Sequence, residues 1–261
     1  MALLDIAGLS LGFGGIEVLR AFDFAVEAGS ITSLIGPNGA GKTSVFNCLT
    51  GFYRPRAGRI SLGGTRIDGL APHRVTRLGL ARTFQNLRLF RELTAAENVM
   101  AGRHCRTGAS ALDAMLGTRR HRHEEAEIAA AARHWLGFVG IIEAADRTAG
   151  SLPYGHQRRV EWARALATEP RLLLLDEPAA GLNVGEKEEL VALMRRIRDE
   201  LGITILLIEH DMGLVMQVSE HIGVLDHGRK IAEGTPERVQ NDPLVIEAYL
   251  GRDDDDASAA A

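Results

Sequence analysis

Residues 36–43 read Gly-Pro-Asn-Gly-Ala-Gly-Lys-Thr and match the pattern G-x4-G-K-[ST]. The apolar run from Ser30 to Ile35 predicts a short strand before them, and the residues from Lys42 onward predict a helix. The glycines let the backbone curl so that consecutive N–H groups point at phosphate oxygens, and the helix adds its positive end. The segment therefore predicts a nucleotide-phosphate site, in preference to a glycine-rich turn beside a surface lysine.

The residues of this loop have distinct expected roles in binding ATP with Mg²⁺. Lys42 is expected to reach the β- and γ-phosphates, Thr43 to ligate Mg²⁺, and Ser44 to donate to the α-phosphate. The other cofactor-binding residues of the loop are Gly36, Pro37, Asn38, Gly39, Ala40 and Gly41. ATP and Mg²⁺ are therefore the cofactors that the loop predicts.

A second apolar run ends in a pair of acids. Leu172 to Leu175 predict a buried strand, and Asp176-Glu177-Pro178 follow it directly. Beside a phosphate loop, Asp176 is expected near Mg²⁺ through a water, and Glu177 is expected to polarise the attacking water. The alternative is a strand-end turn with two solvated acids, which the phosphate loop makes the weaker interpretation.

The rest of the chain alternates strand-like and helical stretches, which indicates an α/β fold. In the first part, Phe22, Phe24 and Val26 alternate as on a half-buried strand, and Gly63-Gly64 predicts a hairpin within an antiparallel β layer. From about Arg88 to Gly150 the pattern is helical, with a capping box at Thr94–Glu97.

Within that helical part, Arg103 to Arg122 is predicted to be a loop and Glu124 to Val139 a helix. After Ser151 the alternation returns. It predicts strands at 172–175, 203–208 and 222–225, helices at 185–201 and 211–219, a hairpin turn at 226–229, and a last helical region after the N-cap Thr235 and Pro236. Residues 253–261 are expected to be disordered.

Composition limits the classes of protein that remain. Of 261 residues, 46% are apolar and 25% are charged, as in an ordinary globular protein, and no apolar run reaches the length of a membrane span. The net charge of −4 equals the charge of Asp253 to Asp256, so the rest is neutral and general nucleic-acid binding is not expected. Two distant cysteines and the absence of a basic start to a secretory signal favour a reducing cytosol.

Six segments together resemble the ATP-binding-cassette family, the ATP-hydrolysing subunits of ABC transporters. In the family's order they are Phe13 as adenine-stacking aromatic, the loop Gly36–Ser44, Gln85 as the glutamine of the glutamine loop, the signature Leu152-Pro-Tyr-Gly-His156, the acids Asp176-Glu177, and His210 as the switch histidine. Phe13 is alternatively a core residue of a strand. The resemblance extends from Leu3 to Gly251.

The chain resembles more closely the LivG-like branch, which comprises ATPases of branched-chain amino acid uptake systems. The supporting stretches are Gly12–Gly15, Tyr154–Arg159, Asp176–Asn183, Ile208–Met212, Ile231–Pro236 and Asn241–Gly251. The signature departs from the family's Leu-Ser-Gly-Gly-Gln. The expected contact residues there are Pro153, Tyr154, Gly155 and His156, and Pro153 lacks the hydroxyl and N–H of a serine.

The resemblance implies a P-loop ABC-ATPase fold with an antiparallel β layer and a helical signature subdomain. It implies one nucleotide-binding domain over 1–252, with a core at about 1–87 and 165–252 and the helical subdomain at about 88–164. It implies catalytic roles for Lys42, Glu177 and His210, and a metal site at Thr43, Gln85 and Asp176, the last acting through water.

The implied partners are a second cassette, which binds head to tail, and transmembrane permease subunits at the cytoplasmic face of the membrane. A solute-binding protein would act indirectly, and no nucleic acid is expected. The family's groove for a permease helix corresponds to residues 85–90 and the helix after Thr94, where Leu87, Leu89 and Phe90 are either docking residues or subdomain core.

Two other functions remain open on the sequence. One is a soluble cassette ATPase that acts on nucleic acid or ribosomes, although the chain has one cassette and no heptad arm. The other is the motor of a lipid-export or urea transporter. The sequence identifies no cargo site and does not determine whether the ATPase dimer is homomeric.

Overall fold

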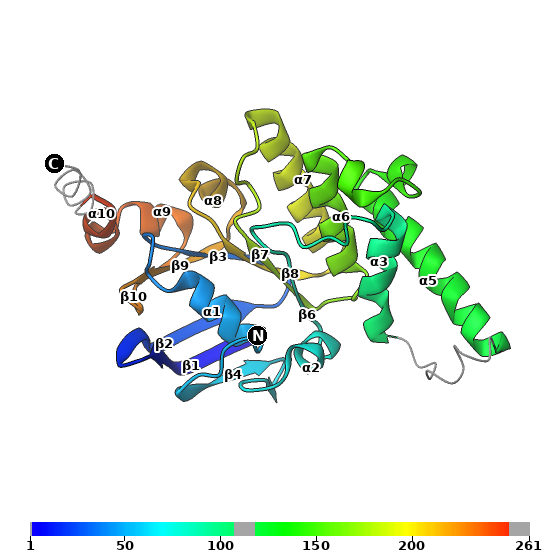
Figure 1. The fold of residues 1–261 in the computed structure, drawn as a ribbon. Helices are drawn as coiled ribbons and strands as arrows, with labels where there is room; N and C mark the ends of the chain where they lie inside the picture. Colours follow the sequence, from blue (N-terminus) through cyan, green and yellow to red (C-terminus); the bar gives the residue numbers. More distant parts are fainter. Residues whose placement is uncertain (1, 107–117, 251–261) are drawn as a thin grey trace. The chain divides into compact units, whose positions relative to one another are not determined.

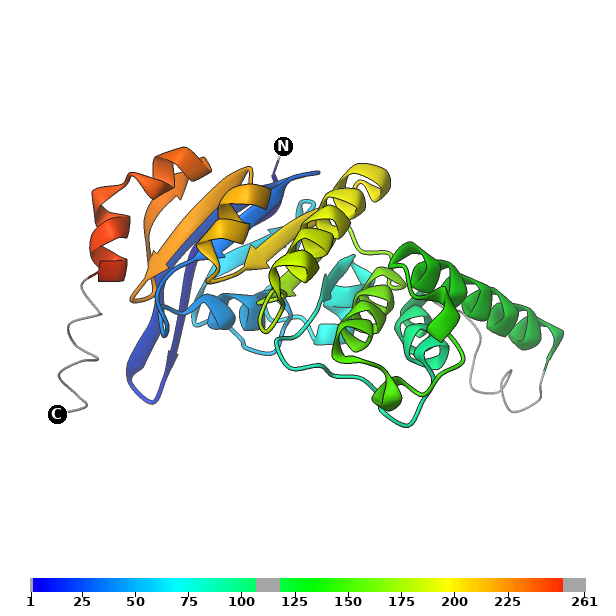
Figure 2. The same ribbon diagram turned by 90° about the horizontal axis from the view of Figure 1, so that it is seen from above.

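The computed structural model describes residues 2–106 and 118–250, which form two compact units. The first unit comprises residues 2–75 and 171–250, and the second comprises residues 76–106 and 118–170. Figures 1 and 2 show their elements in two views. Each unit has buried residues of its own.

One sheet of the first unit is antiparallel and has the strand order β2-β1-β4-β5. Its strands are β1 (Ala2–Phe13), β2 (Ile16–Glu27), β4 (Ala57–Leu62) and β5 (Thr65–Arg66). Alternate residues of β2, Phe22, Phe24 and Val26, are buried, and Gly63-Gly64 connects β4 to β5. The predicted antiparallel layer and hairpin are therefore confirmed, although the sequence analysis did not anticipate β1.

A second sheet places the strands of the nucleotide core in the order β10-β9-β3-β8-β7. They are β3 (Ile31–Ile35), β7 (Leu172–Asp176), β8 (Thr204–Ile208), β9 (His221–Asp226) and β10 (Arg229–Gly234). All residues of β3, β7 and β8 are buried, as in parallel strands covered on both faces. Because β3, β7 and β8 are parallel, the residues that follow them meet at one edge.

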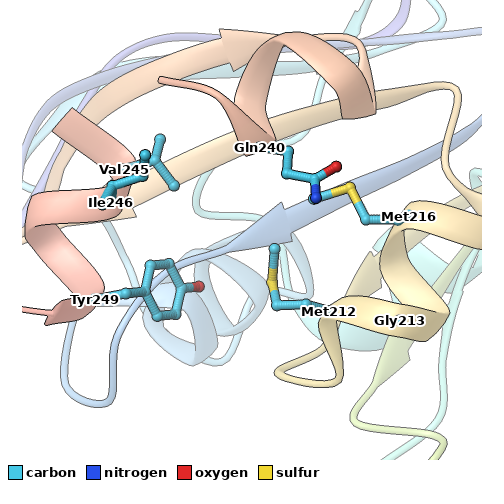
Figure 3. Close-up of a pocket in the computed structure, with 7 residues that line it drawn as sticks. All are labelled: Met212, Gly213, Met216, Gln240, Val245, Ile246 and Tyr249. Carbon is cyan, nitrogen blue, oxygen red and sulfur yellow. The ribbon is translucent and has the colours of Figure 1, made fainter. Parts of the chain in front are cut away.

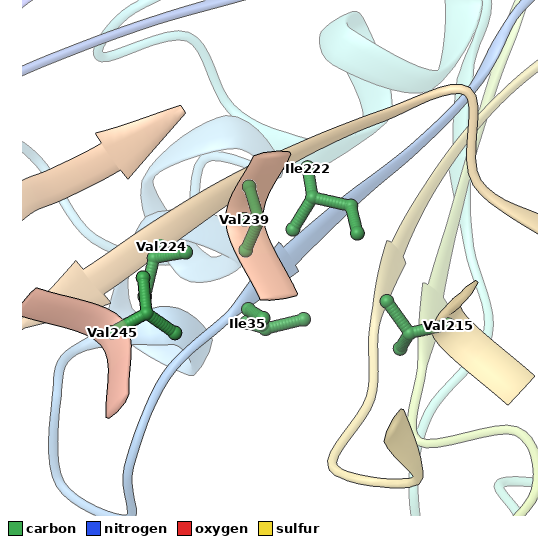
Figure 4. Packing of buried hydrophobic residues seen from close by; sticks show 6 residues of the cluster. All are labelled: Ile35, Val215, Ile222, Val224, Val239 and Val245. Carbon is green, nitrogen blue, oxygen red and sulfur yellow. The ribbon is translucent and has the colours of Figure 1, made fainter. Parts of the chain in front are cut away.

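Helices flank these strands, and their bounds are α1 (Lys42–Leu49), α2 (Pro72–Arg77), α7 (Val184–Leu201), α8 (Met212–Val218), α9 (Pro236–Gln240) and α10 (Pro243–Leu250). A cluster of buried aliphatic residues joins α8, α9 and α10 to β3 and β9 (Figure 4). Its members are Ile35, Val215, Ile222, Val224, Val239 and Val245. The two short C-terminal helices are thus part of the core beneath the second sheet.

The second unit is mainly helical. Its elements are β6 (Leu80–Arg82), α3 (Ala95–Arg103), α5 (Arg119–Phe138), α6 (Tyr154–Leu166) and 3-10 turns at His104–Arg106, Ile142–Ala144 and Ala149–Ser151. The helices α3, α5 and α6 pack against one another. Arg106 extends the packing by donating to the carbonyl oxygens of Arg77, Thr168 and Glu169.

The loop predicted at Arg103 to Arg122 is wrong at its end. Helix α5 already begins at Arg119, because the Thr118 side chain accepts a hydrogen bond from the His121 N–H and caps the first turn. Arg120 also lies 3.8 Å from Glu124 one turn later. The part of the predicted loop at 107–117, and the predicted disordered tail at 253–261, lie outside the described residues.

Thr94→Ala is expected to destabilise α3. The Thr94 hydroxyl accepts from the Glu97 N–H at 3.1 Å, and the Glu97 carboxylate accepts from the Thr94 N–H at 2.7 Å, which confirms the predicted capping box. Loss of an N-cap costs about 1 kcal/mol of unfolding free energy. Urea unfolding should show this loss for Thr94→Ala and not for Thr94→Ser, and equal stability of all three proteins would contradict it.

Candidate functional site

The phosphate loop adopts a backbone that requires glycine at two of its positions. Gly36 has φ of 147°, and a Cβ there would lie 1.9 Å from the Leu225 carbonyl oxygen. Gly41 has φ of 110° and precedes the first residue of α1, where a Cβ would lie 2.9 Å from the Leu19 side chain. Both positions combine a left-handed conformation with a close approach, so a larger residue would displace the loop.

Lys42 is held against the loop that contains it. Only 8% of this residue is exposed, and its Nζ donates to the carbonyl oxygens of Gly36 at 2.6 Å and Pro37 at 2.9 Å. Thr43 is exposed and Ser44 is partly exposed in the first turn of α1, where the helix N–H groups are free of helical partners. This arrangement presents a cation, two hydroxyls and backbone donors, which is the chemistry that a polyphosphate needs.

The two acids lie at the end of β7, at the same edge of the sheet. Asp176 is the last residue of β7, is 6% exposed, and pairs in register with Ile208 of β8. Glu177 has a positive φ of 48°, and its N–H donates to the Ile208 carbonyl oxygen at 2.9 Å. This turn brings Glu177 Oε2 to 3.8 Å from Nδ1 of His210, so the predicted base and switch histidine lie together in the first unit.

Glu209 supports this pair and was missed by the sequence analysis. It is buried, and its Oε1 accepts from the Ala179 N–H at 2.7 Å. Its Oε2 accepts from the N–H groups of His210 at 3.0 Å and Asp211 at 3.4 Å. Asp211 in turn caps α8 and forms a 2.5 Å ion pair with Lys187, which lowers the pKa of Asp211. Glu209 therefore connects the segment after Glu177 to the backbone of His210.

The first unit offers few oxygen ligands for a metal. Across residues 2–106 and 118–250, no group of three or more His, Cys, Asp or Glu side chains could hold a metal ion. The exposed Thr43 hydroxyl and the buried Asp176 carboxylate, which ends β7 at the same edge of the second sheet, are two hard oxygen donors. They fit Mg²⁺, which binds through one or two protein oxygens together with substrate phosphates rather than in an all-protein cage.

Phe13 lies at the end of β1 and is not a core residue. It is 48% exposed, and its ring meets the edge of Tyr53 with centroids 5.1 Å apart. The alternative that Phe13 packs in the core is therefore wrong. An exposed aromatic face is available for stacking, and the adenine role stays a prediction.

The signature residues belong to the second unit and begin α6. Pro153 is the N-cap residue and Tyr154 the first helical residue, so the helix presents backbone donors at Tyr154, Gly155 and His156. Arg158 donates to the Tyr154 hydroxyl at 3.0 Å and lies over its ring. The Nδ1 atom of His156 is buried and has no hydrogen-bond partner in the described part of the chain.

The glutamine-loop segment is attached to α6 through Glu161, a second residue that the sequence analysis missed. Gln85 itself is exposed. The buried Glu161 carboxylate accepts from the Arg88 N–H at 3.4 Å, and Arg164 donates to the Arg88 carbonyl oxygen at 2.5 Å. Burial raises the pKa of Glu161, and interactions with Arg164 and the backbone oppose this effect without cancelling it.

The neighbouring residues predicted for docking differ in exposure. Phe90 is 55% exposed, whereas Leu87 and Leu89 are partly exposed. Asn98, which is fully buried in α3, accepts from the Phe90 N–H at 2.9 Å and donates to its carbonyl oxygen at 3.0 Å. Asn98 therefore fixes the backbone of Phe90 through two hydrogen bonds, while the Phe90 side chain is exposed to solvent. The Phe90 side chain is not part of the subdomain core.

Comparisons with known proteins identify the class. The family model described as "ABC transporter" matches residues 19–180, and the model described as "Branched-chain amino acid ATP-binding cassette transporter" matches residues 229–255. The chain therefore belongs to the ATP-binding cassettes of ABC transporters, which confirms the family that the six segments predicted.

Individual relatives cover nearly the whole chain. It is 49% identical to the high-affinity branched-chain amino acid transport ATP-binding protein BraF of Pseudomonas aeruginosa and 47% identical to LivG of Escherichia coli K12. Each alignment covers 95% of this chain and 98% of the relative. A nucleotide-free ATP-binding cassette from an ABC transporter superposes with a TM-score of 0.83 at 32% identity, covering 95% of this chain and 99% of that one, so the predicted fold class is confirmed.

Glu161→Gln is expected to change how stability depends on pH. Since the pKa of Glu161 is raised in the folded state, the unfolded chain loses this proton first, and the carboxyl's contribution to stability falls as pH rises above its usual pKa. Glutamine cannot ionise. Urea unfolding between about pH 4.5 and about pH 7.5 should therefore show Glu161→Gln gaining stability relative to the parent as pH rises.

Asp68→Asn is the control of opposite sign. A hydrogen bond from Arg66 lowers the pKa of Asp68, so its contribution is present above the usual pKa and is lost as pH falls. Asp68→Asn should therefore lose stability relative to the parent as pH rises toward about 4, the usual pKa of an Asp carboxyl, with little further change above that pH. The same slope for both variants would contradict the pKa directions assigned to the two carboxyls.

Proposed function

We propose that this chain is the ATP-hydrolysing motor subunit of an importer for branched-chain amino acids. The observation that carries the proposal is the convergence of the phosphate loop with Asp176, Glu177 and His210 at one edge of the second sheet. The substrate class is supported by the match at residues 229–255 and by relatives that are named as branched-chain amino acid transport proteins.

ATP binding uses the geometry of the loop. The backbone donors and Lys42 bind the phosphates, and Lys42 exchanges its bonds to Gly36 and Pro37 for phosphate oxygens. Mg²⁺, when bound with the nucleotide near Thr43 and Asp176, supplies positive charge at the phosphates. Phe13 offers a face to adenine, and Gln85 is a further residue proposed for the metal region.

Hydrolysis depends on Glu177 and His210. The Glu177 carboxylate accepts a proton from the attacking water, and His210 donates to the γ-phosphate. Glu209 positions both because it holds the backbone of Ala179 and His210. The chain therefore contributes Glu177 as the base, His210 as the hydrogen-bond donor, and the buried Glu209, which fixes the distance between them.

A second cassette completes the site in this proposal. The N–H groups at the start of α6, with Gly155 among them, face the nucleotide held by the partner cassette, and no serine hydroxyl takes part. The cassette works at the cytoplasmic face of the membrane and docks on permease subunits, while a solute-binding protein acts through the permease. Within residues 2–106 and 118–250, no helix is long and apolar enough to span a bilayer.

Glu177→Gln is the main test of the mechanism. The substitution keeps the shape of the side chain and removes its basicity, so hydrolysis should fall by about 10²- to 10⁴-fold while ATP binding persists. The variant should then accumulate as an ATP-bound dimer in size-exclusion chromatography. Hydrolysis at the parental rate with ATP-loaded protein that stays monomeric would show that Glu177 is not the base.

Lys42→Ala is the matched variant for the binding step. It removes the charge that the phosphates contact, so nucleotide affinity itself should be lost, and with it both hydrolysis and dimerisation.

Gly155→Asp tests the proposed role of the signature residues at the start of α6, which is to face the nucleotide of the partner cassette. It should abolish hydrolysis and leave ATP binding by the isolated chain intact, whereas equal loss of binding would place Gly155 in the chain's own pocket.

Phe90→Asp tests the membrane partner. A charge on this exposed side chain should leave folding and ATP binding intact and prevent copurification with the permease, with loss of branched-chain amino acid uptake in cells. Leu89→Asp should act in the same direction. Phe52→Asp is the control because Phe52 is 52% exposed, close to the 55% of Phe90, and belongs to the first unit. Parental uptake with Phe90→Asp would place the docking surface elsewhere.

A further inference from the structure

The proposed mechanism assigns no role to the buried carboxylate of Glu161, which lies in α6 and is 3% exposed. The first unit has an open apolar groove of about 620 Å³ between α8, α9 and α10 (Figure 3). The residues that line this groove are uncharged, and apolar contacts are non-directional, so the groove selects no particular ligand. The partners of Glu161, in contrast, are specific atoms of the glutamine-loop segment.

Two side chains of α6 bind the backbone of Arg88 in this segment. Residues 83–90 contain no helix or strand, so their backbone N–H and C=O groups need partners elsewhere. The Glu161 carboxylate accepts from the Arg88 N–H at 3.4 Å, and Arg164 donates to the Arg88 carbonyl oxygen at 2.5 Å. Both polar groups of the Arg88 backbone are therefore bound by one helix.

The same carboxylate holds the other end of the loop. The backbone of Phe84 also hydrogen-bonds to Glu161. The Arg88 guanidinium lies 4.3 Å from the centroid of the Phe84 ring, and this cation–π contact joins the two ends of the loop directly. Gln85 follows Phe84 and is exposed. Its backbone is therefore fixed from both sides, by α6 and by the loop itself.

An ion pair within α6 is the alternative role for Glu161. The Arg164 Nη2 atom lies 3.6 Å from Glu161 Oε1, whereas the Arg164 Nη1 atom lies 2.5 Å from the Arg88 carbonyl oxygen. The shorter of these two contacts is thus the one to the loop. A buried ion pair alone adds little to stability, because removing the charges from water offsets their attraction. The bonds to the loop backbone are therefore what favours burying these two charges.

Helix α3 holds the next part of the segment on the same support. A Cβ at Gly102 of α3 would lie 2.3 Å from the Arg164 carbonyl oxygen, so α3 and α6 are in close backbone contact. Asn98 of α3 binds the N–H and the carbonyl oxygen of Phe90. The signature residues begin α6, and Glu161 lies about two turns later. The loop and the signature are thus attached to one packed pair of helices.

We propose that Glu161 is a positioning residue of the ATPase, which together with Arg164 binds both ends of the glutamine loop to α6 and so holds Gln85 in one place relative to the signature residues. Glu161 acts through Gln85, as Glu209 acts through the backbone of His210. The attachment of the loop needs no nucleotide. Only its effect on hydrolysis rests on the proposed function.

Amide hydrogen exchange on the nucleotide-free chain tests the attachment. Glu161→Leu keeps a buried side chain of similar size and removes both acceptor oxygens, so residues 83–90 should exchange about tenfold faster. Glu161→Gln retains an acceptor oxygen and should exchange close to the parent. Ile128→Val is the control, because it destabilises the same unit from the buried face of α5 and should not accelerate this segment selectively. Parental exchange at residues 83–90 in Glu161→Leu would overturn the proposal.

Arg164→Lys is the second variant, for the case in which Glu161→Leu does not fold. Lysine keeps a positive charge beside Glu161 but lacks the fork with which the guanidinium spans Glu161 and the Arg88 carbonyl oxygen. Exchange at residues 83–90 should again rise, by about threefold. Protection equal to that of the parent would show that the charge of Arg164, and not its bond to the loop, is what matters, and would overturn the proposal.

A double-mutant cycle on ATP hydrolysis tests the link to Gln85. Gln85→Ala and Glu161→Leu should each lower hydrolysis about tenfold, and the double variant should be no slower than Gln85→Ala, because Glu161 acts through that residue. Both single variants should also need more Mg²⁺ for half-maximal hydrolysis, by the same factor. Glu161→Gln should restore hydrolysis to within about threefold of the parent.

Failure of the positioning role and failure of the proposed function give different results. Losses that multiply in the double variant, parental hydrolysis by Gln85→Ala, or a Glu161→Gln variant as slow as Glu161→Leu would overturn the positioning role and leave the ATPase assignment intact. A parent chain that shows no Mg²⁺-dependent hydrolysis but keeps the expected exchange pattern would count against the proposed function alone.

Discussion

The close approach of Gly36 to the Leu225 carbonyl oxygen is the constraint on which the phosphate loop depends, because a Cβ would lie 1.9 Å from that oxygen. The hairpin that follows Leu225 extends the contact. The Gly228 N–H donates to the Ala40 carbonyl oxygen at 2.9 Å, and the Gly228 carbonyl oxygen accepts from the Arg20 N–H at 2.9 Å. The loop is therefore shaped by β9 and β2 as much as by its own sequence.

The buried carboxylate of Glu209 holds the turns that carry the proposed hydrolytic residues, Glu177 and His210. Burying Glu209 would be costly without partners, yet its two oxygens accept from the N–H groups of Ala179, His210 and Asp211. The free energy recovered in these bonds is available only when the turn after β7 and the turn after β8 are both formed. The positions of Glu177 and His210 are therefore set together.

The sequence predicted those parts that local patterns determine. The buried apolar runs predicted β3, β7 and β8, and a short side-chain motif predicted the capping box at Thr94. It did not predict β1, whose pairing with β2 contains several register shifts that interrupt simple alternation. Glu209 and Glu161 were also missed, because their roles arise from partners that only the folded chain brings near.

The C-terminal helices are best understood as part of the nucleotide core. Val239 of α9 and Val245 of α10 belong to the same buried cluster as Ile35 of β3 and Val224 of β9. These two strand residues pair in register directly before the contact between Gly36 and Leu225. Without these helices, that face of the central strands would be exposed to water at a cost of roughly 25 cal/mol for each Å². Residues 229–255, which match the model for branched-chain amino acid cassettes, thus stabilise β3, the strand that precedes the phosphate loop. The loop itself lies in the segment that matches the general ABC transporter model. This packing is therefore how the class-specific part of the chain affects the nucleotide chemistry that the wider family shares.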